Sequence, residues 1–414
     1  MPLTLAAIAD DFTGATDLAS MLARGGLSTD LLLGLPPEVA VSQADAVVIA
    51  LKSRTAPVAV AVAESLDCWA WAAAHGATRC YFKYCSTFDS TPEGNIGPVA
   101  EALMQATGAR QTIYTPAFPE NGRTIYQGKL FVGQQLLSES GMRHHPLTPM
   151  TDADLVRVLA AQLKQGRAGL VPWASVRQGA EAVAAALADL SGKGVAHVVV
   201  DALDQSDLDA LAGAVRDWPL VTAGSGLALS LAQLLADGAP AAEDLPAVGG
   251  PALLLSGSCS EATNAQVARW QAGGGALLRL DPLALANGAD LDALADQALS
   301  EPNTLVAATQ PPEQVRAVQT SLGERRAAEL VEAALAHIAI RARDKGIRRF
   351  VVAGGETSGA VAAALGVSQL SVGPSIAPGV PWCTTKDTAP LALALKSGNF
   401  GAETFFADAL ECAP

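Results

Sequence analysis

Short apolar runs alternate with longer amphipathic or alanine-rich stretches along the first part of the chain. Residues 3–9 form an apolar run of strand length, and residues 46–51 and 79–84 are also predicted to be strands, whereas residues 15–23 and 58–74 have the length and composition of helices. Strands that alternate with helices predict parallel strands joined by crossover helices. The first part of the chain is therefore expected to form a layered, doubly wound α/β sheet.

The pattern changes over residues 114–137, where proline and glycine punctuate the sequence and predict loops with a hairpin. Alternation then resumes, with predicted strands over 196–200 and 220–222 and predicted helices over 208–215 and 227–235. The same α/β arrangement is therefore expected to continue beyond the hairpin.

A stretch rich in alanine, proline, glycine and acidic residues, ADGAPAAEDLPAVGGP at positions 236–251, has no apolar periodicity and predicts a linker. Beyond it a second series of strands separated by helices is expected, at residues 252–255, 276–280, 304–308 and 350–353. We therefore predict two α/β domains, each with a mostly parallel sheet flanked by helices, over residues 1–240 and 250–414.

The net negative charge of the chain argues against some classes of binding partner. The 414 residues include 27 Lys and Arg against 41 Asp and Glu, which gives a formal charge of −14. A field of this sign repels phosphate backbones and anionic lipid headgroups. Neither nucleic acid nor a membrane surface is therefore an expected partner.

Other features predict a cytoplasmic protein without a zinc site. The first residues lack a basic segment followed by an apolar stretch, and the uncharged residues 357–385 are interrupted by prolines, which makes a poor membrane helix. The six cysteines include no C-x-x-C pair and have no histidine at metal-ligand spacing, so reduced thiols are expected.

Carboxylates follow the first predicted strand. Ligands of open α/β sheets bind at the carboxyl ends of strands, and Asp10 and Asp11 occupy that position after residues 3–9. Two adjacent carboxylates are unfavourable unless they bind a cation or accept hydrogen bonds. The alternative is that one of them, or Thr13, simply caps the following helix.

Cations gather at the corresponding ends of other predicted strands. Arg54, Lys83 and Arg123 lie in or beside such loops of a strongly acidic chain, which favours a pocket for a carboxylate or phosphate. The alternative is that each is an ordinary solvated residue that neutralises nearby acids. Ser225 lies in another strand-to-helix turn and either contributes to this pocket or only turns the chain.

Three glycine-bearing loops follow apolar runs in the second half, at residues 256–261, 354–359 and 396–401. A Gly/Ser turn that opens a helix favours phosphate, because free N–H groups and the helix dipole both attract anions. Ser258 and Glu261 also fit a capping box. Three such loops together predict a nucleotide site, although the chain has no Walker A motif and no dinucleotide fingerprint after its first strand.

Five segments of the sequence resemble the four-carbon acid sugar kinases, in order along nearly the whole chain. They are IADDFTGA at 8–15, the segment 83–90, SGS at 256–258, GGETSG at 354–359 and SGNFG at 397–401. Each motif is short, but the combination is specific. Within the family the sequence resembles most the kinases that act on 3-oxo-tetronate, with D-threonate and erythronate kinases as near relatives.

The resemblance implies that residues 1–240 bind the acid sugar, that residues 250–414 bind ATP, and that the γ-phosphoryl group passes to the 4-hydroxyl with Mg²⁺ on the nucleotide. Asp11 is then the first candidate for the general base, and Asp89 the second. The substrate-binding candidates are Asp10, Arg54, Lys83, Asn121, Arg123 and Ser225. The ATP-binding candidates are Ser258, Gly354, Gly355, Glu356, Thr357, Ser358, Gly398 and Gly401.

Alternative functions remain open from the sequence. A D-threonate or erythronate kinase of the same family would carry the same motifs, and a non-catalytic sugar-acid sensor would bind ligands without turning over ATP. An oxidoreductase is disfavoured because the dinucleotide fingerprint is missing. The expected partners are a small acid sugar and ATP, and the chain is compatible with a homodimer.

Overall fold

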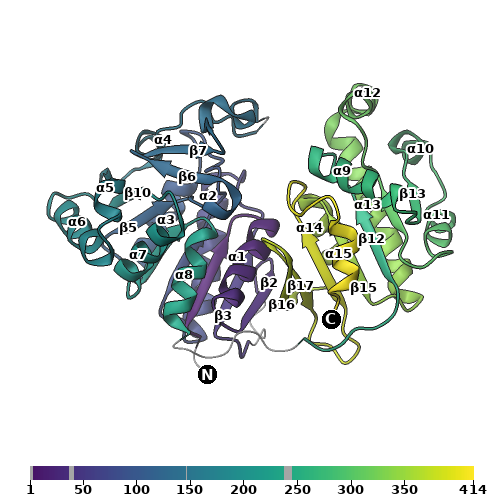
Figure 1. Ribbon diagram of the computed structural model, residues 1–414, viewed down its shortest axis with the longest axis horizontal. Helices are drawn as coiled ribbons and strands as arrows, with labels where there is room; N and C mark the ends of the chain where they lie inside the picture. Colours follow the sequence, from purple (N-terminus) through teal and green to yellow (C-terminus); the bar gives the residue numbers. More distant parts are fainter. Residues whose placement is uncertain (1–2, 37–41, 146, 237–244) are drawn as a thin grey trace. The chain divides into compact units, whose positions relative to one another are not determined.

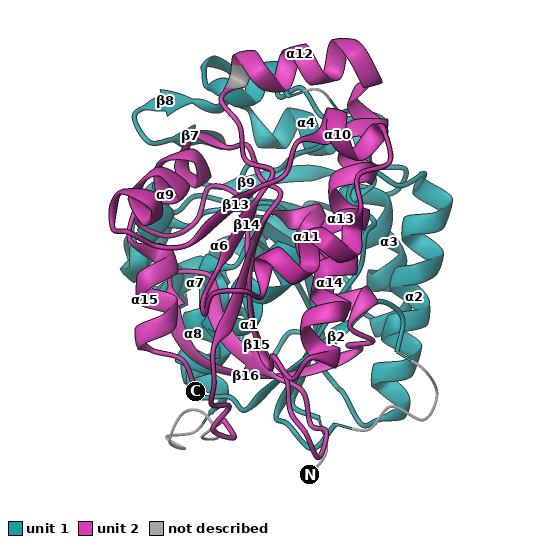
Figure 2. Ribbon diagram, turned by 90° about the vertical axis from the view of Figure 1, so that its right-hand side faces the viewer, with its two compact units in different colours: residues 1–242 teal, residues 243–414 magenta. Residues whose placement is uncertain are grey.

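The computed structural model describes residues 3–36, 42–145, 147–236 and 245–414. It divides into two compact units, residues 1–242 and 243–414, which are coloured separately in Figure 2. Of the predicted linker, residues 245–251 have no helix or strand, and residues 237–244 lie outside the described residues.

Unit 1 contains a sheet in which every strand pairing is parallel. Its strand order is β2-β3-β1-β4-β11-β5-β10-β9. The central strands are fully buried runs of apolar residues, as expected for a sheet covered by helices on both faces. The strands are β1 (Leu5–Ala9), β2 (Thr29–Leu33), β3 (Ala46–Ala50), β4 (Cys80–Lys83), β5 (Thr112–Thr115), β9 (Ala168–Val171), β10 (His197–Val200) and β11 (Leu220–Ala223).

Helices cover both faces of this sheet (Figure 1). The crossover from β1 to β2 runs along the sheet in the opposite direction to those from β3 to β4 and from β4 to β5, so right-handed connections place their helices on opposite faces. One layer packs α1 against α8, α8 against α7 and α7 against α6, and the other packs α3 against α2 and α4. The helices are α1 (Phe12–Arg24), α2 (Val58–Ala74), α3 (Ile96–Thr107), α4 (Leu155–Gln162), α6 (Ala180–Gly192), α7 (Gln205–Val215) and α8 (Gly226–Leu235).

The predicted hairpin is present between β5 and α4. Strands β6 (Arg123–Tyr126), β7 (Lys129–Val132) and β8 (Gln135–Leu136) form a small antiparallel sheet. The short helices η1 (Pro119–Asn121) and α5 (Trp173–Val176) lie in other connections of this unit.

Unit 2 contains a sheet of order β13-β14-β12-β15-β18-β17-β16. The pairings from β13 to β18 are parallel, and β17 pairs antiparallel with both β18 and β16. Both units thus have mostly parallel sheets flanked by helices, which confirms the predicted fold class. The strands are β12 (Ala252–Ser256), β13 (Leu277–Arg279), β14 (Leu305–Ala307), β15 (Arg349–Ala353), β16 (Gln369–Ala377), β17 (Val380–Thr384) and β18 (Ala392–Lys396).

Two helix layers flank the second sheet. One contains α9 packed against α15, and the other contains α13 packed against α14, α11, α10 and α12. Beneath the first layer Trp382, Phe405 and Phe406 are buried in an apolar cluster, and the Trp382 indole N–H donates to the carbonyl of Ala409 at 3.0 Å. The helices are α9 (Glu261–Ala272), α10 (Pro282–Ala286), α11 (Leu291–Ala298), α12 (Pro312–Leu322), α13 (Glu324–Asp344), α14 (Gly355–Ala364) and α15 (Phe405–Glu411).

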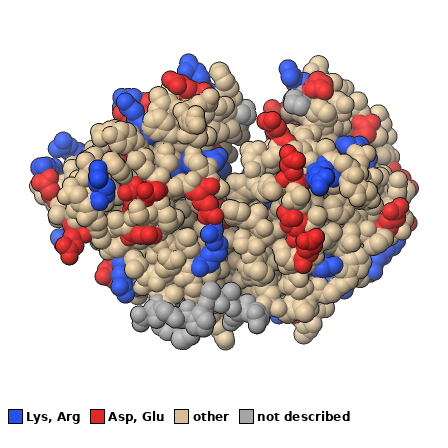
Figure 3. Space-filling view, viewed as in Figure 1, with Lys and Arg blue, Asp and Glu red and all other residues tan. Residues whose placement is uncertain are grey.

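The charged side chains on the surface do not form a basic patch. In the view of Figure 3, acidic and basic side chains are interspersed over the described residues of both units, without a continuous basic area. Among the helices that the structure describes, none is both long enough and apolar enough to span a bilayer.

Candidate functional site

The strand ends of unit 1 converge at one point of the sheet. Strand β1 leads into α1 on one face and its neighbour β4 leads toward α3 on the other, which makes this the topological switch point of the sheet, where a ligand crevice is expected. The register sets Ala9 of β1 beside Ala50 of β3 and Lys83 of β4, and Lys83 beside Ala223 of β11. Residues that follow these strands therefore begin at the same level of the sheet.

Arg54 joins the two carboxylates that follow β1. Its Nε and Nη2 donate to the two oxygens of Asp10, each at 2.9 Å, and Nη2 also donates to Asp11 Oδ1 at 2.5 Å. Asp10 is only 4% exposed, so this paired geometry is what makes its burial tolerable. The predicted cluster of Asp10, Asp11 and Arg54 is thus formed by residues from two neighbouring strand ends.

Asp11 is both a helix cap and an ion-pair partner. Its Oδ1 accepts the backbone N–H of Gly14 at 3.1 Å and lies 3.5 Å from Lys83 Nζ, and the Thr13 hydroxyl donates to its Oδ2 at 2.8 Å. Burial by itself raises the pKa of Asp11, but Arg54, Lys83 and these hydrogen bonds hold it well below its usual range. The capping alternative is therefore correct for Asp11, and Thr13 supports it.

Lys83 and Asp89 extend this cluster from the end of β4. Lys83 is buried, and although burial lowers its pKa, Asp11 and Asp10 raise it by more, so the amine stays charged. Asp89 Oδ1 accepts the Thr87 hydroxyl at 2.6 Å, and its Oδ2 lies 3.7 Å from Arg54 Nη1. Three carboxylates thus neutralise two cations, and the cluster leaves no surplus of positive charge.

Asn95 holds the loop that carries Arg54, and the sequence analysis did not identify it. The side-chain amide of this buried residue donates to the carbonyls of Ser53 at 2.7 Å, Ala56 at 3.2 Å and Arg54 at 3.3 Å. The backbone N–H groups of Ser53 and Arg54 in turn donate to the carbonyl of Asp10. Asn95 therefore fixes the position of Arg54 without an ionic contact.

The remaining predicted substrate residues lie beyond β5 and β11: Asn121 ends η1, Arg123 begins β6, and Ser225 lies in the turn after β11. Arg123 Nη1 donates to the carbonyl of Asn121, whereas its buried Nε has no partner. Within the part of the chain that the structure describes, no carboxylate pairs with Arg123, unlike Arg54 and Lys83. Ser225 precedes α8 and is 1% exposed, and its hydroxyl does not cap that helix.

Unit 2 has its own switch point between β12 and β15, whose connections lead to α9 and α14 in different helix layers. The register aligns Ser256, Ala353 and Lys396 at the ends of β12, β15 and β18. The carbonyl of Ala353 accepts the N–H groups of Gly257 and Ser258, at 3.1 and 3.2 Å. The structure thus brings the three predicted glycine-bearing loops together.

The first turn of α14 has the features of an anion site. Its N-cap is Gly354 (φ 128°), so no side chain caps the helix, and a Cβ added there would lie 3.2 Å from the N–H nitrogen of Ser258. Gly355 begins the helix and does not have a positive φ. The uncapped N–H groups of this turn are free to bind phosphate oxygens.

The predicted capping box at Ser258 and Glu261 is wrong. Helix α9 begins at Glu261, and the residue directly before it, Ser260, accepts the N–H of Thr263 at 3.2 Å. Ser258 lies two residues too early and instead accepts the N–H of Ser260 at 3.2 Å. This leaves Ser258 on the loop beside Gly354.

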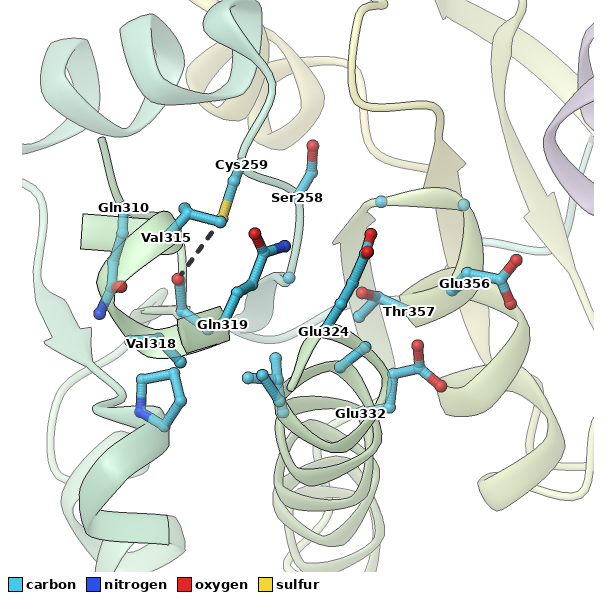
Figure 4. Close-up of a pocket in the computed structure, with 18 residues that line it drawn as sticks. Ser258, Cys259, Gln310, Val315, Val318, Gln319, Glu324, Glu332, Glu356 and Thr357 are labelled. Atoms are coloured by element: carbon cyan, nitrogen blue, oxygen red, sulfur yellow. Dashed lines mark hydrogen bonds between the residues drawn. The ribbon is translucent and has the colours of Figure 1, made fainter. Parts of the chain in front are cut away.

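A cavity of about 340 Å³ opens beside this turn (Figure 4). Five predicted ATP-binding residues line it: Ser258, Gly354, Gly355, Glu356 and Thr357. Its other walls come from α12, α13 and the loop after β14, which the sequence analysis did not identify. They include apolar Val315, Val318 and Val331 and polar Gln310, Gln319, Glu324 and Glu332. Such a mixture of apolar wall and few polar groups is typical of a small-molecule site.

The other three predicted ATP-binding residues do not line this cavity. Ser358 is buried within α14, and Gly401 has φ 82° in the loop after β18. The carbonyl of Gly398 accepts the hydroxyls of Ser260 and Thr263, both at 2.7 Å. These contacts hold the β18 loop against the first turn of α9.

Lys396 is a buried cation beneath the same loops, and the sequence analysis gave it no role. Its Nζ donates to the carbonyls of Ser397 at 2.9 Å and Gly398 at 3.0 Å and to the Thr263 hydroxyl at 3.2 Å. Burial lowers the pKa of Lys396 to about 7, so the amine gains or loses its proton near neutral pH.

Comparisons with known proteins find two domain models in order along the chain. A sugar-binding N-terminal domain model matches residues 5–231, and a nucleotide-binding C-terminal domain model matches residues 253–406. Relatives named 3-oxo-tetronate kinase from Cupriavidus necator and Pseudomonas fluorescens are each 54% identical to the chain, over 98% of it and 96% of their own length.

Two solved structures share the fold over nearly the whole chain. A Salmonella typhimurium LT2 protein has a TM-score of 0.90 at 44% identity, with 98% of each chain covered. A Haemophilus influenzae protein has a TM-score of 0.83 at 44% identity, with 98% of this chain and 99% of that chain covered. With both domain models matched in order and full-length relatives far above 30% identity, the chain belongs to the four-carbon acid sugar kinase family.

Proposed function

We propose that this protein is an ATP-dependent kinase that transfers the γ-phosphoryl group to the 4-hydroxyl of 3-oxo-tetronate. The observation that carries the proposal is the similarity to relatives named 3-oxo-tetronate kinase, which extends over both the sugar-binding and the nucleotide-binding domain. The site geometry supports it, because each unit has its polar side chains or free N–H groups at the switch point of its own sheet.

The cavity of unit 2 suits an adenine nucleotide. The purine base packs against the apolar side of the cavity formed by Val315, Val318 and Val331, while the phosphates lie at the uncapped first turn of α14. Gln319 and Glu324 extend toward Ser258 in Figure 4 and can accept or donate hydrogen bonds to the ribose. The nucleotide therefore spans from α13 to the glycine-bearing loops.

The Mg²⁺ ion is proposed to bind together with the nucleotide. Among the described residues, no group of three His, Cys, Asp or Glu side chains could hold an ion by itself. The described residues are therefore compatible with an ion that is bound mainly by phosphate oxygens and water, as Mg²⁺ usually is. When bound, Mg²⁺ neutralises charge on the transferring phosphoryl group.

The acid sugar binds in unit 1, where Arg123 is the cation for the substrate carboxylate. Arg54 and Lys83 are already engaged by Asp10 and Asp11, whereas the guanidinium of Arg123 has no carboxylate partner among the described residues. Arg54 and Lys83 instead order the carboxylates that bind hydroxyl groups. This division of roles assigns the carboxylate and the hydroxyls of the substrate to different side chains.

We place the reaction in the cytoplasm, where ATP is available and thiols stay reduced, in keeping with six free cysteines among the described residues. A homodimer stays a prediction, which light scattering of the purified protein checks.

The proposed function is tested by ADP release with a series of four-carbon sugar acids, and turnover is expected to be fastest with 3-oxo-tetronate. Faster turnover of D-threonate or erythronate would transfer the assignment to that acid.

Blocking the cavity should weaken nucleotide binding alone. Ala328 lines the cavity and is exposed, so the variant Ala328→Trp fills the space for the base without disturbing the core. We expect the Kd for ATP to rise at least about tenfold, equivalent to about 1.4 kcal/mol, with unchanged affinity for the acid sugar, as measured by calorimetry. Ala333→Trp is the matched control, because Ala333 is exposed on the same helix outside the cavity. Equal ATP affinity of both variants would contradict this placement of the base.

ATP binding should also be coupled to proton uptake by Lys396. Burial lowers the pKa of this amine to about 7, and phosphates at the neighbouring loop would raise it again, because they favour the charged form. At pH 7.5 the calorimetric enthalpy of ATP binding should therefore depend on the ionisation enthalpy of the buffer. Lys396→Met should remove that dependence, after circular dichroism has shown that the variant is folded. Dependence that persists in the variant would assign the proton to another group.

A further inference from the structure

Four carboxylates lie at or near the strand ends of unit 1 that carry the candidate substrate residues, and three of them already have protein partners. Arg54 binds both oxygens of Asp10, and Asp89 accepts Thr87 and faces Arg54. Asp11 has four donors around it, from Arg54, Lys83, Thr13 and Gly14. The negative charge of these three carboxylates is thus stabilised by cations and hydrogen bonds.

The fourth carboxylate, Asp17, is different. It lies in α1, is 5% exposed, and its buried Oδ1 has no hydrogen-bond partner. Ser225 after β11 lies close enough to Asp17 to lower the pKa of that carboxyl, and the buried Thr115 Oγ1 at the end of the neighbouring strand β5 also lacks a partner. Buried polar groups are rarely left unpaired, because desolvation without a partner is unfavourable. The unpaired oxygens of Asp17 and Thr115 point to a polar ligand at this end of the sheet.

Burial, offset in part by neighbouring groups, leaves Asp17 ionised at neutral pH and protonated in mild acid. It faces Lys83 and Tyr81 of β4, Asp11 at the start of its own helix, Glu120 of η1 and Ser225. Burial raises the pKa of Asp17 to about 6, and Ser225 and Lys83 oppose part of that rise. A general base works best when its pKa lies near the operating pH. The pKa of Asp11 is held far lower.

We propose that Asp17 is the general base that receives the proton of the attacking 4-hydroxyl. The inference rests on the proposed kinase function. The O–H bond of the hydroxyl breaks as its oxygen bonds to the γ-phosphorus, and the proton passes to Asp17 Oδ1. The bond from the γ-phosphorus to the bridging oxygen breaks, and its electron pair leaves with ADP. Asp11 then positions Arg54 and Lys83 and does not take the proton.

The pH dependence of kcat for Asp17→Asn, compared with the unmodified protein between pH 5 and 9, tests this assignment. The unmodified protein should lose activity about tenfold per pH unit below its acid midpoint near pH 6, because a protonated Asp17 cannot accept the proton. Asp17→Asn should lower kcat at pH 8 by about 10²–10⁴-fold and lack this acid limb, while its affinity for ATP is unchanged.

Asp201→Asn is the matched control. Asp201 is also buried, and burial also raises its pKa, but its carboxylate accepts the backbone N–H groups of Gln127, Gly128 and Trp173. This variant should unfold at a lower temperature and keep the acid limb. Asp17→Asn should be at least as stable as the unmodified protein at pH 8, since it replaces an unpaired buried carboxylate by a neutral amide.

Three outcomes would overturn the proposal. Asp17→Asn could have a kcat within tenfold of that of the unmodified protein and retain the loss of activity in acid, in which case another group is the base. It could instead lose stability as Asp201→Asn does, which makes Asp17 a structural residue. If the unmodified protein turns over no four-carbon acid, the proposed function fails and this inference fails with it. Turnover of a different acid that shows the same loss in Asp17→Asn would support the inference and change only the substrate.

Discussion

Replacing Arg54 with methionine should abolish turnover and lower the free energy of unfolding by about 3–5 kcal/mol. The guanidinium is the partner of both oxygens of Asp10, which is 4% exposed, and of Asp11. Without it, two adjacent carboxylates remain uncompensated in a poorly solvated crevice, and Lys83 alone is left to balance them. Urea unfolding followed by circular dichroism measures the loss.

Two further variants distinguish the loss of the buried Arg54–Asp10 ion pair from the general effect of removing an arginine. Arg157 makes comparably short contacts with Asp152, both at 2.7 Å, but its side chain is 68% exposed. Arg157→Met should therefore cost no more than about 1 kcal/mol. Adding Asp10→Asn to Arg54→Met should recover a large part of the lost stability. Equal losses for Arg54→Met and Arg157→Met would contradict the buried role of Arg54.

The second large effect concerns the substrate carboxylate. Erythrulose is the neutral analogue in which a hydroxymethyl group replaces the carboxylate of 3-oxo-tetronate, and its kcat/KM should be lower by about a thousandfold or more. A site built to pair a carboxylate leaves the buried part of Arg123 unpaired when a neutral ligand binds. Steady-state ADP release with both compounds measures the ratio.

Arg123→Met tests whether Arg123 is the source of this discrimination. It should lower kcat/KM for 3-oxo-tetronate toward that for erythrulose, while erythrulose turnover changes little. Equal turnover of the two compounds by the unmodified protein would show that the site does not recognise a carboxylate. Discrimination that persists in Arg123→Met would assign that recognition to another cation.

Much of the α/β framework could be predicted, because parallel buried strands leave long apolar runs. The helix expected at residues 58–74 is α2, with the same bounds, and the strands expected at 46–51 and 252–255 differ from β3 and β12 by one residue each. These elements are long or uniformly apolar, so local pattern and tertiary burial agree.

Elements with weak local patterns were missed. Strand β9 has the sequence AGLV, is mostly half-buried, and combines only four residues with an internal glycine and a single β-branched residue. Strand β16 contains Gly373 and Pro374, which predict a break. The structure accommodates them at a register irregularity opposite β17, where proline does not interrupt regular pairing.

The candidate site could be predicted in part, for a topological reason. Asp10, Arg54 and Lys83 lie at or just beyond strand ends of unit 1, and Ser258 lies just beyond a strand of unit 2. Knowledge of which strands are parallel is therefore enough to bring each of them to the carboxyl edge of the sheet in its own unit. The cavity wall on α12 and α13 depends on how two helices pack, which no local motif encodes. Asp17 is one polar residue within a buried helix, and its missing partners become visible only when its neighbours are placed.

Identification of the phosphorylated product is the decisive test of phosphoryl transfer to the sugar acid. The protein is incubated with Mg²⁺, ATP and 3-oxo-tetronate generated in situ, and phosphorus-31 magnetic resonance follows the reaction. We predict one new phosphate monoester, formed in step with ADP and split into a triplet by the two methylene protons at carbon 4. A doublet would place the phosphate on the hydroxyl of carbon 2, and free phosphate with ADP as the only products would contradict transfer to the sugar acid.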